Sequence, residues 1–192
     1  MTRILDLLLS LIALIFLGWL ILLAYLIACI DTRSNGMFTQ QRIGKGLKPF
    51  RVYKIKSMKV IPGYDSTTTT NKDPRVTAFG EFIRKTKIDE LPQVLNVLFG
   101  DMSLVGPRPT VIDDYNRMSS EQKRRADVRP GITGLAQING NTSLNWPERI
   151  KYDLYYVENK SVPLYFSILL RTVVLLLTNK ASSHPNSSDE WK

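Results

Sequence analysis

The sequence contains a single cysteine, Cys29, and a single histidine, His184, in 192 residues. One cysteine forms no intramolecular disulfide and builds no thiolate zinc cluster, because both need at least two sulfurs. One histidine, in a segment rich in Ser, Asn and Pro, argues against histidine-ligated metals and against Ser-His or Cys-His catalysis. Any catalysis must therefore depend on carboxylates, hydroxyls, lysines or arginines.

Acidic residues are also scarce. The chain has 17 Asp and Glu against 26 Lys and Arg, a formal net charge of +9 at pH 7. The first thirty residues contain only Arg3 and Asp6 as charged residues, so the whole basic excess follows them. A basic excess is typical of proteins that bind nucleic acid or an anionic membrane. The length fits one ordinary domain, or a smaller domain with a membrane anchor, better than two similar domains.

A long apolar run occupies the start of the chain, and from Leu7 to Ile30 no residue is charged. As a helix this run is about 36 Å long, which exceeds the roughly 30 Å hydrocarbon core of a bilayer and permits a tilted span. It is too long for a signal peptide, and no small-x-small cleavage site precedes Asp31. Gly18 lies near the middle, where a helix can bend and return, so a re-entrant hairpin is the alternative to a span.

A basic segment follows the apolar run. Between residues 31 and 64 the only acidic residue is Asp31, against eight basic ones: Arg33, Arg42, Lys45, Lys48, Arg51, Lys54, Lys56 and Lys59. By the positive-inside rule this flank lies in the cytoplasm, against an anionic leaflet. Before the run, the i,i+3 spacing of Arg3 and Asp6 predicts an ion pair at the headgroup level, with an unpaired Arg3 as the alternative.

The rest of the chain predicts a mixed α/β domain that is mainly helical. Residues 37–59 alternate apolar and polar positions around a Gly-Lys-Gly-Leu-Lys-Pro turn, which is typical of a β-hairpin. Residues 61–73 have the composition of a loop, and residues 128–140 form a second Gly- and Pro-rich stretch. Apolar spacing and capping residues predict helices over 79–87, 89–100, 119–126 and 146–157.

The C-terminal part differs in character from this domain. Residues 164–177 are nearly all apolar, with Arg171 alone inside, and are too few to span a bilayer. We expect an amphipathic helix that lies in the interface or packs against the anchor. The polar segment 179–192 is predicted to be a disordered tail.

The strongest chemical signal is the acidic pair Asp89-Glu90 at the start of a predicted helix. A helix N-terminus favours anions, so its dipole is expected to keep Asp89 ionised, as a nucleophile or a metal ligand. Adjacent helical residues point about 100° apart, which suits one divalent cation and one nucleophile better than two opposed carboxylates. An ordinary capped helix gives the same pattern.

Basic residues in stiff segments are candidates for binding phosphate. Pro107 and Pro109 exclude a helix around Arg108 and fix where its side chain points. Arginine contacts phosphate oxygens in pairs, and phosphoryl chemistry depends on positioning and charge neutralisation. The sequence has neither a Walker A loop nor a GxGxxG motif. Four aromatic residues, Trp146, Tyr152, Tyr155 and Tyr156, have the spacing of core packing more than of a nucleobase platform.

Four segments together resemble the bacterial sugar transferases, and more narrowly the small monotopic phosphoglycosyl transferases. They are Phe38-Thr39-Gln40 with Arg42 and Gly44, the stretch YKIKSM at 53–58, the run DPRVTAFGEFIRKTKIDELPQVLNVLFGDMSLVGPRP at 73–109, and VRPGITGLAQING at 128–140. The resemblance extends from Arg3 to about Leu177. Two departures are Leu17-Gly18, where the family usually has Ser-Pro, and Leu135, where relatives commonly carry Trp.

The resemblance implies transfer of a sugar 1-phosphate from a UDP-sugar to undecaprenyl phosphate, with release of UMP, as the first membrane step of bacterial glycoconjugate assembly. Carried over, Asp89 attacks the sugar-bearing phosphate and forms a covalent intermediate, and Glu90 assists. The two carboxylates bind Mg²⁺ in this family. Arg108, with Arg84, Lys56 and Arg129 as weaker candidates, would neutralise the substrate phosphates.

The expected organisation is a membrane anchor over 1–31, a cytoplasmic catalytic domain over 32–178 at the bacterial inner membrane, and the tail over 179–192. Expected partners are the UDP-sugar, the lipid phosphate and membrane lipids, but no nucleic acid. Two other functions stay open, a membrane-bound nucleotide-sugar hydrolase and a non-enzymatic polybasic membrane-binding module. No motif in the sequence identifies the sugar or an oligomeric state.

Overall fold

A computed structural model of the chain describes residues 2–61, 73–140 and 143–178. The elements in chain order are α1 (Thr2–Thr32), β1 (Met37–Ile43), η1 (Lys45–Leu47), β2 (Pro49–Ile55), α2 (Ala78–Lys85), η2 (Ile88–Glu90), α3 (Gln93–Phe99), β3 (Ser103–Val105), α4 (Ile112–Asn116), η3 (Gln122–Asp127), β4 (Gly131–Thr133), α5 (Leu135–Ile138), α6 (Trp146–Asn159) and α7 (Val162–Leu177). The mixed, mainly helical fold is confirmed. The predicted tail, and nearly all of the loop predicted over 61–73, lie outside the described residues.

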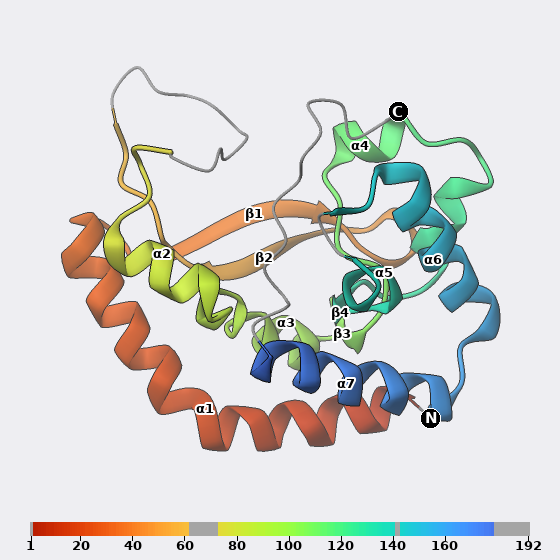
Figure 1. Cartoon of the computed structure of the whole chain (residues 1–192), viewed down its shortest axis with the longest axis horizontal. Coiled ribbons are helices and arrows are strands. Elements are labelled where there is room, and N and C mark those ends of the chain that lie inside the picture. Colours follow the sequence, from red (N-terminus) through yellow and green to blue (C-terminus); the bar gives the residue numbers. More distant parts are fainter. Residues whose placement is uncertain (1, 62–72, 141–142, 179–192) are drawn as a thin grey trace.

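The first helix, α1, runs along one side of the whole domain (Figure 1). It is continuous through Gly18, but its axis bends, so its first part runs beside α7 and its last part beside α2. It is long and apolar enough to cross a membrane, and only 11% of its most apolar window is buried. Its middle exposes large apolar side chains, among them Ile15, Phe16 and Trp19.

Both ends of α1 are bound to the folded domain. Near its start, Asp6 is buried and accepts hydrogen bonds from Ser103 Oγ, from the Leu104 backbone N–H and from Tyr165 OH of α7, at 2.8–2.9 Å. Near its end, Ala24 and Ala28 pack in one apolar cluster with Ile55 of β2 and Ile83 of α2. The helix is therefore held at two points, with an apolar stretch between them.

The predicted ion pair between Arg3 and Asp6 is wrong, and so is the alternative of an unpaired Arg3. The Arg3 guanidinium donates to the carbonyl oxygens of Val97 and Leu98, in the last turn of α3. These carbonyls have no partner inside their own helix, and a cation at a helix C-terminus complements its dipole. Arg3 therefore fastens the anchor to α3.

The predicted hairpin is confirmed. Strands β1 and β2 pair antiparallel, from Met37 opposite Ile55 to Ile43 opposite Pro49. Phe50 and Val52 face inwards and pack on Val97 of α3 and Met102. The buried Asn96 fixes the same contact, because its amide donates to the Arg51 carbonyl at 2.7 Å and accepts from the Tyr53 N–H at 3.1 Å.

A second, parallel pair was not predicted from the sequence. Strand β3 pairs with β4, with Ser103 opposite Gly131 and Val105 opposite Thr133. The two backbones approach so closely that a Cβ at Gly131 would lie 2.1 Å from the Gly106 nitrogen. Only glycine fits there, because real Cβ atoms do not come that close to a backbone atom. The Gly- and Pro-rich stretch is thus a tight backbone crossing under the loop that carries Arg108.

Helices α2, α6 and α7 confirm the predictions for their parts of the chain. The helix predicted from Asp89 begins later: Ile88–Glu90 is a 3-10 turn, and α3 starts at Gln93 and ends at Gly100, where φ is +92°. The helix predicted over 119–126 is the 3-10 helix η3, and α4 was not predicted. Pro92 explains the delay, since a proline fits the first turn of a helix and not a later one.

Candidate active site

The acidic pair lies on a sharp turn between α2 and α3. Lys87, which precedes the turn, has a left-handed backbone with φ of +60°, an uncommon conformation for a residue with a Cβ. Asp89 is buried, with 8% of its surface exposed, and its Oδ1 atom has no hydrogen-bond partner among the described residues. A buried carboxylate oxygen without a partner is costly, so the turn holds this atom ready for a ligand.

Glu90 is held by two cations from distant parts of the chain. Its Oε1 atom accepts from Lys54 Nζ of β2 at 2.7 Å and from Arg108 Nη2 at 2.8 Å. Burial works to raise the pKa of Glu90, but the charges of Arg108 and Lys54 prevail and hold it well below the usual value. Glu90 is therefore ionised at neutral pH.

The charge state of Asp89 has the opposite cause from the one expected. Burial, and then the charge of Glu90, raise the pKa of Asp89 to about 6, against the opposing charges of Lys54, Lys87 and Arg84. The expectation that a helix dipole keeps Asp89 ionised is wrong, because Asp89 precedes α3 by a full turn and does not cap it. At pH 7 about nine in ten Asp89 side chains are still ionised, and a raised pKa makes the carboxylate more basic.

The loop that carries Arg108 is fixed from below. The Gly106 N–H donates to the Thr133 carbonyl and the Gly131 N–H donates to the Pro107 carbonyl, both at 2.9 Å. On the other side Arg125 Nη2 donates to the Arg108 carbonyl at 3.0 Å. Arg125 in turn forms a buried ion pair with Asp153 of α6 at 2.6 Å. These contacts determine where the Arg108 side chain leaves the backbone, as the two prolines predict.

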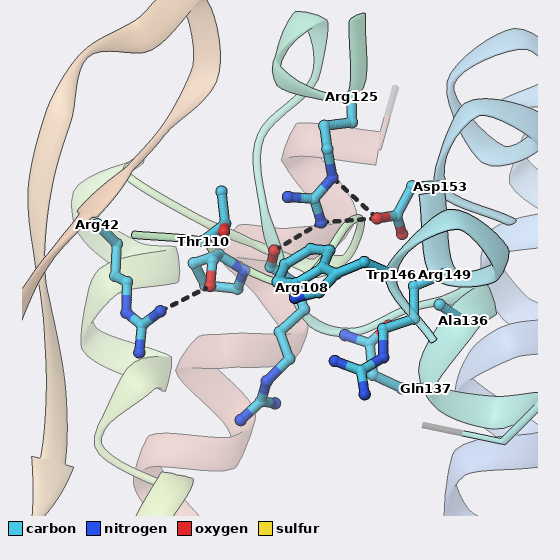
Figure 2. A pocket seen from close by; sticks show the side chains of 10 residues that line it. Arg42, Arg108, Thr110, Arg125, Ala136, Gln137, Trp146, Arg149 and Asp153 are labelled. Carbon is cyan, nitrogen blue, oxygen red and sulfur yellow. Dashed lines mark hydrogen bonds and ion pairs between the residues drawn. The ribbon is translucent and has the colours of Figure 1, made fainter. Parts of the chain in front are cut away.

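Two cavities meet at Arg108. The first, which we call the arginine cavity, has a volume of about 100 Å³ and is lined by Arg42, Arg108, Pro109, Thr110, Arg125, Ala136, Gln137, Trp146, Arg149 and Asp153. Figure 2 shows the guanidinium groups of Arg42, Arg108 and Arg149 on one side of Trp146, with the ion pair between Arg125 and Asp153 on the other. Four arginines against one acid that is already paired make this cavity strongly positive.

The second, which we call the apolar cavity, is larger, with a volume of about 200 Å³. Its walls come from α3, β4, α5 and α7, and its lining is mainly aliphatic: Thr86, Lys87, Glu90, Leu91, Val94, Arg108, Ile132, Thr133, Gln137, Ile138, Thr172, Leu175 and Leu176. Glu90 and Lys87 bring charge to it. Arg108 and Gln137 line both cavities, so the acidic turn lies where a polar site and an apolar site join.

The structure brings together only some of the predicted site residues. Asp89, Glu90 and Arg108 form one cluster, and Arg84 is near enough for its charge to lower the pKa of Asp89. Lys56 instead donates to Ser34 Oγ at 2.9 Å, and Arg129 Nε donates to the Gly100 carbonyl at 2.7 Å. We therefore withdraw Arg129 as a phosphate ligand, because it caps the far end of α3.

Sequence reasoning missed Lys54, which holds Glu90. The strand period carried the signal, because Lys54 follows Phe50 and Val52 on the face of β2 that packs on α3. It also missed Arg42, Thr110, Arg149 and Gln137, which line the arginine cavity from four different segments. No local pattern unites these residues, since only the fold brings them together.

The described residues contain no group of three or more His, Cys, Asp or Glu side chains placed to share a metal ion. A cation at the acidic turn would therefore have at most two carboxylates as protein ligands. Mg²⁺ is typically bound in this way, by one or two carboxylates and otherwise by substrate phosphates and water. The unpartnered Oδ1 atom of Asp89 fits such a ligand.

Comparison with known proteins gives a consistent result. The profile of a family described as bacterial sugar transferase matches residues 1–179. The galactosyl transferase CpsE of Streptococcus agalactiae is 42% identical over 154 residues, which are 73% of this chain and 34% of that protein. The UDP-glucose:undecaprenyl-phosphate glucose-1-phosphate transferase of Klebsiella pneumoniae is 39% identical over 191 residues, covering 94% of this chain and 41% of that protein.

A third relative has a similar length. The exopolysaccharide production protein PSS of Rhizobium leguminosarum is 39% identical over 191 residues, covering 92% of this chain and 94% of that protein. The chain thus spans between a third and a half of the first two relatives, and nearly all of the third.

Proposed function

The chain belongs to the bacterial sugar transferase family, and on that premise we propose that it transfers a sugar 1-phosphate from a UDP-sugar to undecaprenyl phosphate. The observation that carries the proposal is the junction of the two cavities. There a buried nucleophile, Asp89, lies beside a glutamate that two cations hold ionised. A polar donor and an apolar lipid can reach this point from different sides.

In the first step the Asp89 carboxylate attacks the phosphorus that carries the sugar. A bond forms between the Asp89 oxygen and this phosphorus, the bond from the phosphorus to the bridging oxygen of the diphosphate breaks, and UMP leaves with that oxygen. Arg108 is placed to neutralise charge on the diphosphate, and its two prolines and Arg125 hold it there before substrate arrives. The product is an acyl phosphate of Asp89.

In the second step an oxygen of the lipid phosphate attacks the same phosphorus and frees the Asp89 carboxylate. The apolar cavity supports this step, because aliphatic side chains of α3, β4 and α7 surround it and Lys87, Glu90 and Arg108 bring charge to it. Those features match a phosphate on a hydrocarbon chain. Two half-reactions let the same phosphate-binding groups serve both bulky substrates in turn.

Mg²⁺ is the expected cofactor, and Asp89 and Glu90 are the residues that would hold it. When bound, Mg²⁺ supplies positive charge to the phosphate oxygens. The protein side chains do the rest: Lys54 and Arg108 hold Glu90 in place, and burial keeps the Asp89 carboxylate out of water.

Lys54 offers a direct test of this assignment. We expect Lys54→Met to lower kcat/KM for transfer about 10- to 100-fold, because Glu90 loses one of its two charged hydrogen bonds. Removal of a positive charge also raises the pKa of Asp89, so the acid limb of the pH profile moves to higher pH. The matched control is Lys56→Met, two residues along, which leaves both quantities near the wild-type values. An equal loss in both variants would contradict the assignment.

We place α1 in the membrane as a re-entrant helix, with the catalytic domain on the cytoplasmic face of the inner membrane. A helix that crosses a bilayer puts its ends about 30 Å apart on opposite sides. Here Asp6 and Ala28, near the two ends, both contact the same domain, and the apolar middle between them is exposed. The basic segment that follows α1 supports the cytoplasmic side.

Thiol labelling distinguishes this topology from a span. Cys29 is the only cysteine in the chain, so Cys29→Ser gives a background for single cysteines at Thr2→Cys or Asn35→Cys. We expect both positions to react with a membrane-impermeant maleimide in inside-out vesicles and neither to react in spheroplasts. Labelling of the Thr2→Cys variant in spheroplasts would show that α1 crosses the membrane.

The function is tested by UMP release. The full-length protein in nanodiscs is given Mg²⁺ and a panel of UDP-sugars, with and without undecaprenyl phosphate. Release that depends on the lipid, together with a lipid-linked sugar product, is the expected result. Release of equal size without lipid would mean that water is the acceptor and the protein is a hydrolase. No release from any UDP-sugar would contradict the proposal.

A further inference from the structure

The arginine cavity contains two buried polar groups whose hydrogen bonds the protein does not supply. The Thr110 Oγ1 atom and both amide atoms of Gln137 have no hydrogen-bond partner among the described residues. Thr110 is only 4% exposed, and its carbonyl accepts from the Ile43 N–H of β1 at 3.0 Å, which fixes its position. Buried groups of this kind lower stability, so their presence in a cavity points to a ligand that bonds them.

The charge of the cavity favours one part of the donor. Asp153 is the only acid in the lining and is paired with Arg125, so Arg42, Arg108 and Arg149 leave an excess of positive charge. In a UDP-sugar the nucleoside carries a phosphate of its own, whereas the sugar ring is neutral. During transfer the leaving UMP gains negative charge. A positive cavity that starts at Arg108 therefore suits the nucleotide side of the donor.

The chemistry of Gln137 favours a particular edge of that nucleotide. A carboxamide presents an acceptor and a donor side by side. Uracil presents the complementary pair, the N3–H donor beside the C4 carbonyl acceptor. On the grounds of geometry and charge, we propose that the arginine cavity binds the UMP part of the donor and that Gln137 recognises the imide edge of its uracil ring. This inference rests on the proposed function, since that function makes the donor a UDP-sugar.

Direct binding of two nucleotides tests the inference without any turnover. UMP and N3-methyl-UMP are titrated into the full-length protein in nanodiscs, because the methyl group removes the N3–H donor and leaves the phosphate and ribose unchanged. We expect the wild type to bind UMP about tenfold more tightly than N3-methyl-UMP. The Gln137→Met variant should bind both nucleotides equally, at the weaker affinity. Gln41→Met, at an exposed position on β1, is the matched control and should keep the preference.

Thr110→Val gives a second, independent variant. Its hydroxyl has no protein partner, so its replacement by a methyl group of the same shape should leave the unfolding temperature unchanged and weaken UMP several-fold. Equal affinity of the wild type for both nucleotides, or a preference that survives Gln137→Met, would overturn the inference. Those results would leave the proposed function standing if UDP-sugar is turned over. Absence of turnover would count against the function, whatever the nucleotides do.

Discussion

Asp89→Asn is expected to lower the rate of sugar-phosphate transfer by about 10⁴-fold or more. The substitution keeps the size of the side chain and removes the charge that attacks phosphorus. Asp89 is the only carboxylate of the pair whose oxygen is free to react, because the Oε1 atom of Glu90 is held by Lys54 and Arg108. UMP release and lipid-linked product, measured in the same reaction, give the rate.

Two controls make this result specific. Asp113→Asn, at an exposed position on α4, changes a carboxylate far from the turn and should leave the rate unchanged. The Asp89→Asn protein should also bind UMP as the wild type does, since the nucleotide cavity does not contain Asp89. A variant that retained a tenth of the wild-type rate would mean that another group is the nucleophile.

Arg108→Ala is expected to reduce kcat/KM by about 10²- to 10³-fold, the usual effect of losing one preorganised donor to a developing charge. The side chain lines both cavities and bonds Glu90, so its loss affects the donor, the lipid phosphate and the acidic pair together. Arg108→Lys should recover only part of the loss, because lysine lacks the planar, forked donors of arginine.

Arg129→Gln is the comparison that separates a site arginine from a structural one. Arg129 donates to the Gly100 carbonyl and so caps the end of α3 away from the acidic turn. We expect this variant to lower the unfolding temperature modestly and to change kcat/KM by less than about threefold. A loss as large as that of Arg108→Ala would contradict the view that Arg129 is structural.

The local elements were predictable because their signals are local. The alternation of residues 37–59 gave the hairpin, and the spacing of Phe79, Phe82 and Ile83 gave α2. The prolines around Arg108 also predicted a fixed loop, and the structure agrees. In each case neighbours along the chain determine the geometry, so the sequence contains the information in a readable form.

The errors share a different cause, which is contact between distant segments. Arg3 was expected to pair with Asp6, yet it bonds to carbonyls of α3 nearly a hundred residues away. Asp89 was expected to gain charge stability from a helix dipole, yet burial under the folded domain sets its pKa. Lys56 was chosen over Lys54, although β2 ends at Ile55 and only Lys54 faces α3.

The most direct test of the central claim is the intact mass of the protein after incubation with UDP-sugar and Mg²⁺ in the absence of undecaprenyl phosphate. A covalent intermediate predicts an increase by one sugar phosphate, located by peptide mapping on Asp89 and lost when the lipid phosphate is added. The Asp89→Asn protein should show no increase. An unmodified wild-type protein that nevertheless transfers sugar phosphate to lipid would mean that the donor reacts directly with the lipid, and would contradict the account.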